Sequence, residues 1–111
     1  MAYSYMELDE VLDAEPVAAD KNVSEVARSS RGFVTAYERA EGNPDFLGTD
    51  RYSGQWWDDR RKAFVSRHMG QIKRNSEPLW KDGEPTRRHL ALMMWAYTPT
   101  RERTLRWLDR L

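Results

Sequence analysis

The chain has no cysteine, and its 111 residues include only two histidines, His68 and His89. The absence of cysteine excludes a disulfide scaffold and every zinc site built on thiolates. No G-x-S-x-G, H-E-x-x-H or P-loop pattern is present, and these are the short motifs that carry the commonest catalytic machinery. We therefore expect a protein that is not an enzyme, with no cofactor, no metal and no small-molecule substrate.

Long apolar runs are missing as well. No segment approaches the roughly 20 apolar residues needed to cross a bilayer, and the acidic start MAYSYMELDE differs from the basic and then apolar start of a secretory signal. These two absences predict no contact with a membrane and a cytoplasmic location, with a virus particle as the alternative. The length is typical of one domain.

The balance of charge hides a strong asymmetry. The chain has 18 basic and 18 acidic residues, so its formal net charge is zero. Residues 1–27 contain seven acids and one base, for a net charge of −6, whereas residues 60–111 contain five acids and thirteen bases, for +8. Such a division between the two ends of a chain predicts an interaction tail or a surface that faces a polyanion.

Apolar residues at helical spacing predict an all-α fold, a small bundle of three to four helices over residues 23–111. No convincing strand alternation appears. Gly, Pro, Asn, Ser and Thr supply the start and stop signals. The expected helices run from Val23 or Ser29 to Glu41, from a cap at Ser53 to about Arg74, from Thr86 to before Pro99, and from Thr98 or Thr100 to the end.

Residues 1–22 are predicted to be an acidic and extended N-terminal tail. The segment contains turn residues and no long apolar period, and an isolated helix this short would be marginal in water. Short acidic and apolar segments of this kind often fold into the groove of a partner. The predicted partner-binding residues of the tail are Tyr5, Met6, Leu8, Val11 and Leu12.

A basic face is predicted on the second helix, where Arg60, Arg67 and Arg74 are spaced by seven residues beside Trp56. On a straight helix this spacing drifts by only about 20° per step, so the three guanidinium groups share one side. The face would suit a phosphate backbone or an acidic protein surface. A solvated face with no partner remains the alternative.

Arg87 and Arg88 form a second basic cluster at a predicted helix start. Positive charge at a helix N-terminus opposes the helix dipole. We therefore expect a compensating negative group, which would be Glu84, the acids of the tail or a bound anion. Like the arginines of the basic face, Arg87 and Arg88 are predicted to bind a partner or the phosphates of a nucleic acid.

The two histidines fit structural roles better than chemical ones. His68 lies within the apolar stripe of the second helix, which predicts a core histidine with one hydrogen-bond partner. His89 falls in the first turn of the third helix, which predicts a partly exposed side chain. A general base or a metal ligand would need a second group converging on the ring, and no spacing in the sequence indicates one.

Two functional hypotheses follow. The first is a small, non-catalytic interaction or structural protein that acts as a subunit or adaptor in a larger assembly, for which a viral assembly is one setting. Its partner would be another protein or a second copy of the chain. The alternative is a nucleic-acid-binding module that uses the basic faces of residues 60–111, with the acidic tail as an internal mask.

Overall fold

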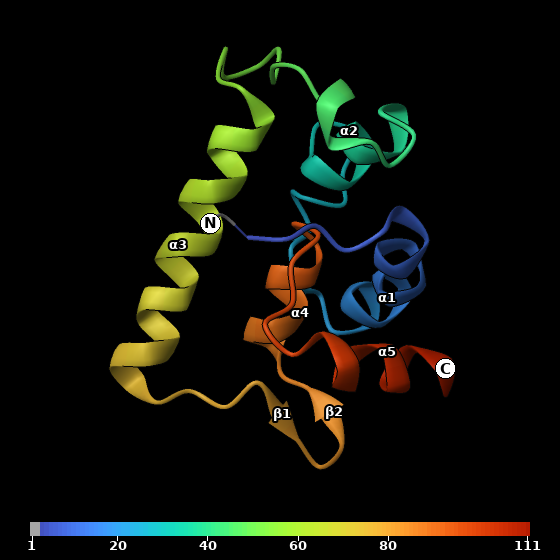
Figure 1. The fold of residues 1–111 in the computed structure, drawn as a ribbon, viewed down its shortest axis with the longest axis vertical. Helices are drawn as coiled ribbons and strands as arrows, with labels where there is room; N and C mark the ends of the chain where they lie inside the picture. The colour runs from blue at the N-terminus through green and yellow to red at the C-terminus, as the bar shows by residue number, and fades with distance from the viewer. Residues whose placement is uncertain (1–2) are drawn as a thin grey trace.

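The computed structural model describes residues 3–111, which fold into a mostly helical structure (Figure 1). The helical class is confirmed, but the expectation of a strictly all-α fold is wrong because a short hairpin is present. The elements of the described range are α1 (Leu8–Asp20), α2 (Phe33–Arg39), the 3₁₀ turn η1 (Pro44–Phe46), α3 (Trp57–Asn75), β1 (Trp80–Lys81), β2 (Glu84–Pro85), α4 (Arg87–Met93) and α5 (Arg101–Asp109).

The hairpin joins α3 to α4. Trp80 pairs with Pro85 and Lys81 pairs with Glu84 in an antiparallel register. The two residues between the strands are Asp82 and Gly83, with φ angles of 54° and 79°. Asp-Gly favours this two-residue turn because both central residues need positive φ. Strands of two residues are too short to show the alternation by which a strand is predicted.

The N-terminal segment is not extended, because Leu8–Asp20 form α1. The backbone N–H of Glu7 donates to the Glu10 carboxylate at 2.9 Å, as part of a capping box that begins the helix. Val11, Ala14 and Ala18 fall on one side of α1 and are fully buried. This side packs against α2, α4 and α5, so α1 belongs to the same core as the other helices.

Helix α4 lies at the centre of the molecule. Its apolar residues surround the helix axis, and Leu90, Leu92 and Met93 are fully buried, as expected of a helix that is apolar on all sides. It ends earlier than predicted, at Met93, because the chain turns and Ala96 adopts a left-handed φ of 59°.

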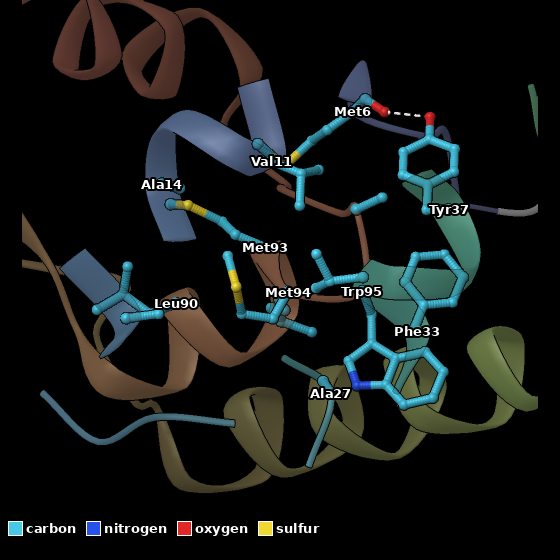
Figure 2. Packing of buried hydrophobic residues seen from close by; sticks show 14 of the residues in the cluster. Met6, Val11, Ala14, Ala27, Phe33, Tyr37, Leu90, Met93, Met94 and Trp95 are labelled. Carbon is cyan, nitrogen blue, oxygen red and sulfur yellow. Dashed lines mark hydrogen bonds between the residues drawn. The ribbon is translucent and has the colours of Figure 1, made fainter. Parts of the chain in front are cut away.

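Aromatic rings fill the part of the core beside α4 (Figure 2). The Phe33 ring stacks on Trp95 with the ring centroids 5.0 Å apart. The Tyr37 hydroxyl donates a hydrogen bond of 2.7 Å to the backbone carbonyl of Met6, and Met6 itself is only 1% exposed. The first contact joins α2 to the turn that follows α4, and the second fixes the N-terminal segment to α2.

Helix α2 is shorter than predicted. Residues 24–31 form successive turns, and the α-helix begins only at Phe33. Gly32 sits at the junction, where a Cβ would lie 2.1 Å from the Val26 carbonyl oxygen and 2.2 Å from that of Ala27. No other residue type fits this close approach, so Gly32 ends the turns and allows α2 to begin.

Helix α3 runs along one side of the molecule, and the loop that leads into it lies at one end of the long axis (Figure 1). Its cap is Trp56, and not Ser53 as predicted. The Ser53 hydroxyl instead donates to the Asp50 carboxylate at 2.9 Å. The helix ends where Ser76 adopts a left-handed conformation, φ 50°.

Candidate functional site

The predicted partner-binding residues of the tail all contact the protein's own core. Met6 and Val11 are fully buried, and Tyr5, Leu8 and Leu12 are partly buried against the same cluster. The Tyr5 hydroxyl donates to the Asp58 carboxylate on α3 at 2.7 Å. Burial, followed by this hydrogen bond, raises the pKa of Tyr5. In this structure the five side chains therefore hold the N-terminal segment in place.

Arg61 is the residue that anchors the N-terminal segment, and sequence reasoning missed it. Its guanidinium group is buried, lies 3.6 Å from the centre of the Tyr5 ring, and has no carboxylate partner among residues 3–111. Burial lowers the pKa of Arg61. The guanidinium donates to the backbone carbonyl oxygens of Tyr3, Ser4, Trp95 and Ala96 at 2.7, 3.0, 2.7 and 2.9 Å.

The predicted row of arginines on α3 divides into two kinds. Arg60 forms an ion pair of 2.5 Å with Asp50, whose carboxylate is buried. Arg67 and Arg74 are exposed, and neither has a carboxylate within 4 Å in the described part of the chain. Lys73 lies on the same exposed side and is likewise unpaired. Of the three arginines in the row, only Arg67 and Arg74 therefore offer positive charge that is not paired within the described part of the chain.

Arg87 and Arg88 are both engaged in contacts within the protein. The Arg88 guanidinium binds both oxygens of Glu77, at 3.0 and 2.9 Å, and donates to Gln71 at 2.6 Å. Arg87 donates to the backbone carbonyl of Lys21 at the end of α1. The compensating acid for Arg88 is thus Glu77 and not Glu84.

His68 is half-buried between α3 and α4. Its ring stacks on Phe64 with the centroids 4.1 Å apart, and Nδ1 lies 2.9 Å from a guanidinium nitrogen of Arg88. Burial, and then the charges of Arg88 and Arg67, lower the pKa of His68. The neutral ring therefore acts as a packing partner for Phe64 and Arg88.

His89 is fully buried, so the prediction of a partly exposed side chain is wrong. Nδ1 lies 3.1 Å from the Leu79 carbonyl oxygen, and Nε2 lies 2.7 Å from the Thr98 hydroxyl, which is in turn 2.8 Å from that of Thr104. Burial lowers the pKa of His89 to about 4. This chain of hydrogen bonds ties the hairpin to the turn before α5.

Exposed aromatic side chains gather in the loop that precedes α3. Phe46, Tyr52 and Trp56 are 70%, 57% and 60% exposed, although other aromatic residues of this protein lie in the core. Arg31, Arg39 and Arg51 line one hollow with Phe46 and Tyr52, and none of the three has a carboxylate within 4 Å in residues 3–111. We define the aromatic–arginine surface as Phe46, Tyr52 and Trp56 together with Arg31, Arg39 and Arg51.

A shallow hollow of about 190 Å³ lies within this surface, between α2, η1 and the loop. Phe46, Tyr52 and all three arginines line it. The Arg31 guanidinium stacks over the Tyr52 ring at 3.9 Å, and on the far side of this pair a second hollow contains Val26, which is 76% exposed. The stacked pair therefore forms a wall between two neighbouring depressions.

The carboxylate that lines both hollows, Asp50, is neutralised inside the protein. It accepts hydrogen bonds from the Tyr52 backbone N–H at 3.0 Å, from the Ser53 hydroxyl at 2.9 Å and from Arg60 at 2.5 Å. Burial opposes its charge, but together these hydrogen bonds hold the pKa of Asp50 below its usual value. The hollows consequently present positive charge and aromatic rings.

Sequence reasoning selected Trp56 and missed the rest of the aromatic–arginine surface. The available signal was a loop rich in Gly, Asp and Ser that nevertheless contains Phe46 and Tyr52, since connecting loops have little core in which to bury such rings. Arg31 and Arg39 lie in a different part of the sequence, and only the fold brings them to this loop.

Comparisons with protein-family models, with curated proteins and with solved structures found no match to this chain. Within residues 3–111, no helix is long and apolar enough to cross a bilayer. The same residues contain no group of three His, Asp or Glu side chains placed to hold a metal ion.

Proposed function

We propose that this chain is a non-catalytic interaction protein that acts as a subunit or adaptor in a larger assembly and meets its partner through the aromatic–arginine surface. The observation that carries the proposal is the exposure of Phe46, Tyr52 and Trp56 on one loop. Tyr, Trp and Arg are the residue types that contribute most of the binding energy at protein interfaces. An exposed group of these residue types at one end of the molecule is typical of a surface that contacts another protein.

The loop that carries these rings is held in one conformation. Thr49 pairs with Trp56 across the loop, the Trp57 N–H donates to the Gly48 carbonyl at 3.0 Å, and Asp50 holds the turn at Tyr52. A surface that is ordered before binding loses less conformational entropy when a partner arrives. This arrangement supports a docking role for the rings.

The test compares the assembly state of the chain when it is purified from cells that naturally make it. The wild-type protein should elute as part of a larger complex, and the Tyr52→Ala, Trp56→Ala double variant should elute as a free monomer. The matched control is Leu111→Ala, which removes another exposed apolar side chain, 61% exposed, from a different part of the surface. A double variant that still purifies in the full complex would contradict the proposal.

A second candidate function is the binding of nucleic acid along the exposed side of α3. Arg67, Lys73 and Arg74 are unpaired there in the described structure, and the small residues Ala63, Ser66 and Gly70 leave the helix open to close approach by a phosphate backbone. In this candidate the acidic N-terminal segment does not mask the basic side of α3, because α1 packs on α2, α4 and α5.

A further inference from the structure

Helix α1 carries an uncompensated negative charge. Residues 7–20 contain six carboxylates and no basic side chain. Glu10 binds Arg101 through both oxygens, at 3.0 and 2.9 Å. None of the other five carboxylates has a Lys, Arg or His side chain within 4 Å in the part of the chain that the structure describes.

The exposed carboxylates lie on one side of α1. Asp9, Asp13 and Asp20 are exposed, and so are Pro16 and Ala19 between them. Like charges four residues apart, such as Asp9 and Asp13, destabilise a helix by a few tenths of a kcal/mol per pair. We call these five residues the acidic face; none of its three carboxylates forms an ion pair within residues 3–111.

The aromatic–arginine surface has the complementary character. It offers three guanidinium groups without a carboxylate partner, and flat rings that pack well on small apolar side chains such as Pro16 and Ala19. Within one molecule the two surfaces lie on neighbouring elements, since α2, which carries Arg39, packs against α1 (Figure 1). The four ion pairs of the described structure include none between them.

We propose that the partner of the aromatic–arginine surface is a second copy of this chain, which docks through its acidic face. The inference rests on the proposed function and names its partner. Since the formal net charge is zero, two copies have no net repulsion to overcome at long range. The two surfaces differ, so the contact runs head to tail and produces an open chain or a closed ring.

Sedimentation equilibrium of the purified full-length protein tests this inference. At an ionic strength of about 0.01 M, where the screening length is about 30 Å, the weight-average mass should rise with concentration beyond that of a dimer or stop at a closed ring. At about 1 M salt, where the screening length is about 3 Å, the protein should sediment as a monomer.

Charge reversal separates this contact from general attraction. Arg39→Glu with Arg51→Glu should abolish association, and Asp9→Lys with Asp13→Lys should do the same. An equimolar mixture of the two variants should associate again, because each kind of face then finds an opposite one. The matched control is Arg67→Glu with Arg74→Glu, which makes the same change of charge on α3 and should leave association unchanged. Far-ultraviolet circular dichroism confirms that each variant is folded.

The inference would be overturned by a monomer at every concentration at low salt, by association that survives both reversed variants, or by a control that associates no better than they do. Association only after a polyanion such as an oligonucleotide is added would also overturn it. Failure here is distinguishable from failure of the proposed function, since a monomeric pure protein can still enter a larger complex through Tyr52 and Trp56.

Discussion

Individual buried polar side chains connect segments of this protein that are distant in the sequence. Arg61 bridges the N-terminal segment and the turn after α4, and His89 bridges the hairpin and the turn before α5. A buried polar group without a partner would be expensive, so each of these residues ties the segments that satisfy it into one arrangement. The stability of the fold should therefore be sensitive at these two positions.

Replacing Arg61 by Met keeps the apolar stem and removes the donors of four hydrogen bonds to buried or partly buried carbonyl oxygens. We expect the free energy of unfolding to fall by more than about 3 kcal/mol, because hydrogen bonds to charged groups contribute about 1.5–3 kcal/mol each and the carbonyls lose their partners. Urea denaturation measures this. Arg67→Met, at an exposed position, should stay within about 0.5 kcal/mol of wild type; equal midpoints for both variants would contradict the role of Arg61.

The lowered pKa of His89 predicts a pH dependence of stability. The pKa is about 4 in the folded protein against an ordinary value of 6.5, so the unfolded chain takes up the proton more readily. The contribution of the neutral ring is complete above pH 6.5 and is lost as the pH falls towards 4, by about 3 kcal/mol in total. Urea denaturation between pH 7 and 4 measures it.

The matched pair for this experiment is His89→Asn and His68→Gln. The first variant should show a flatter dependence of unfolding free energy on pH than wild type, even though its stability at neutral pH is lower. The second should retain most of the fall, because His89 is still present. A His89→Asn variant with the wild-type slope would show that other groups cause the acid sensitivity.

At the scale of elements, α1 is part of the core and its removal should unfold the protein. A fragment of residues 23–111 lacks Met6, Val11 and the buried alanines of α1, and full burial of a side chain such as Val or Met contributes about 1.5–3 kcal/mol. Several such losses are comparable to the whole stability of a small domain. Circular dichroism and urea titration should show no cooperative unfolding for this fragment.

The control for the truncation is Asp9→Ala with Asp13→Ala, which changes only exposed positions of α1 and should keep the cooperative transition. A fragment of residues 23–111 that unfolds as cooperatively as the full chain would mean that α1 is dispensable for the fold.

The sequence predicted α3 better than the N-terminal segment, for identifiable reasons. Phe64, Val65 and Ile72 repeat at helical spacing, and α3 appears close to the predicted limits. In α1 the buried positions include Ala14 and Ala18, whose small side chains give a weak apolar signal beside many acids. Their burial depends on close packing with α2, α4 and α5, which no local pattern encodes.

The candidate site was predictable only in fragments. Charge and spacing placed Arg67 and Arg74 on one side of α3, where they are exposed. The same reasoning could not distinguish them from Arg60, which is paired with Asp50 from a distant loop. Whether an arginine is free or engaged depends on tertiary neighbours, and the same holds for Arg88, which binds Glu77.

For the molecule as a whole, the meaning of the charge asymmetry changes once the ion pairs are known. Part of the surplus of bases in residues 60–111 is engaged in ion pairs and hydrogen bonds within the protein. These bases are Arg60, Arg61, Arg87 and Arg88. Exposed charge without an ion pair in the described structure includes negative charge on α1, and positive charge on α3, on the aromatic–arginine surface and on α5 at Arg103 and Arg106. A neutral molecule with distinct surfaces of opposite sign is suited to oriented contacts more than to non-specific binding of polyanions.

The nucleic-acid candidate makes a quantitative prediction from this distribution. If α3 contacts the phosphates of duplex DNA, the slope of log affinity against log salt should fall by about two for Arg67→Ala with Arg74→Ala, since each released contact contributes about 0.9. Fluorescence anisotropy across a salt series measures the slope.

The matched control, Arg106→Ala with Arg110→Ala, removes two exposed bases near the C-terminus and should leave the slope unchanged. Arg88→Ala should lower the unfolding temperature and not the slope, because its guanidinium is bound to Glu77. Equal reductions by both double variants would mean diffuse attraction without a defined site, and no binding at low salt would leave α3 without a role in contacting nucleic acid.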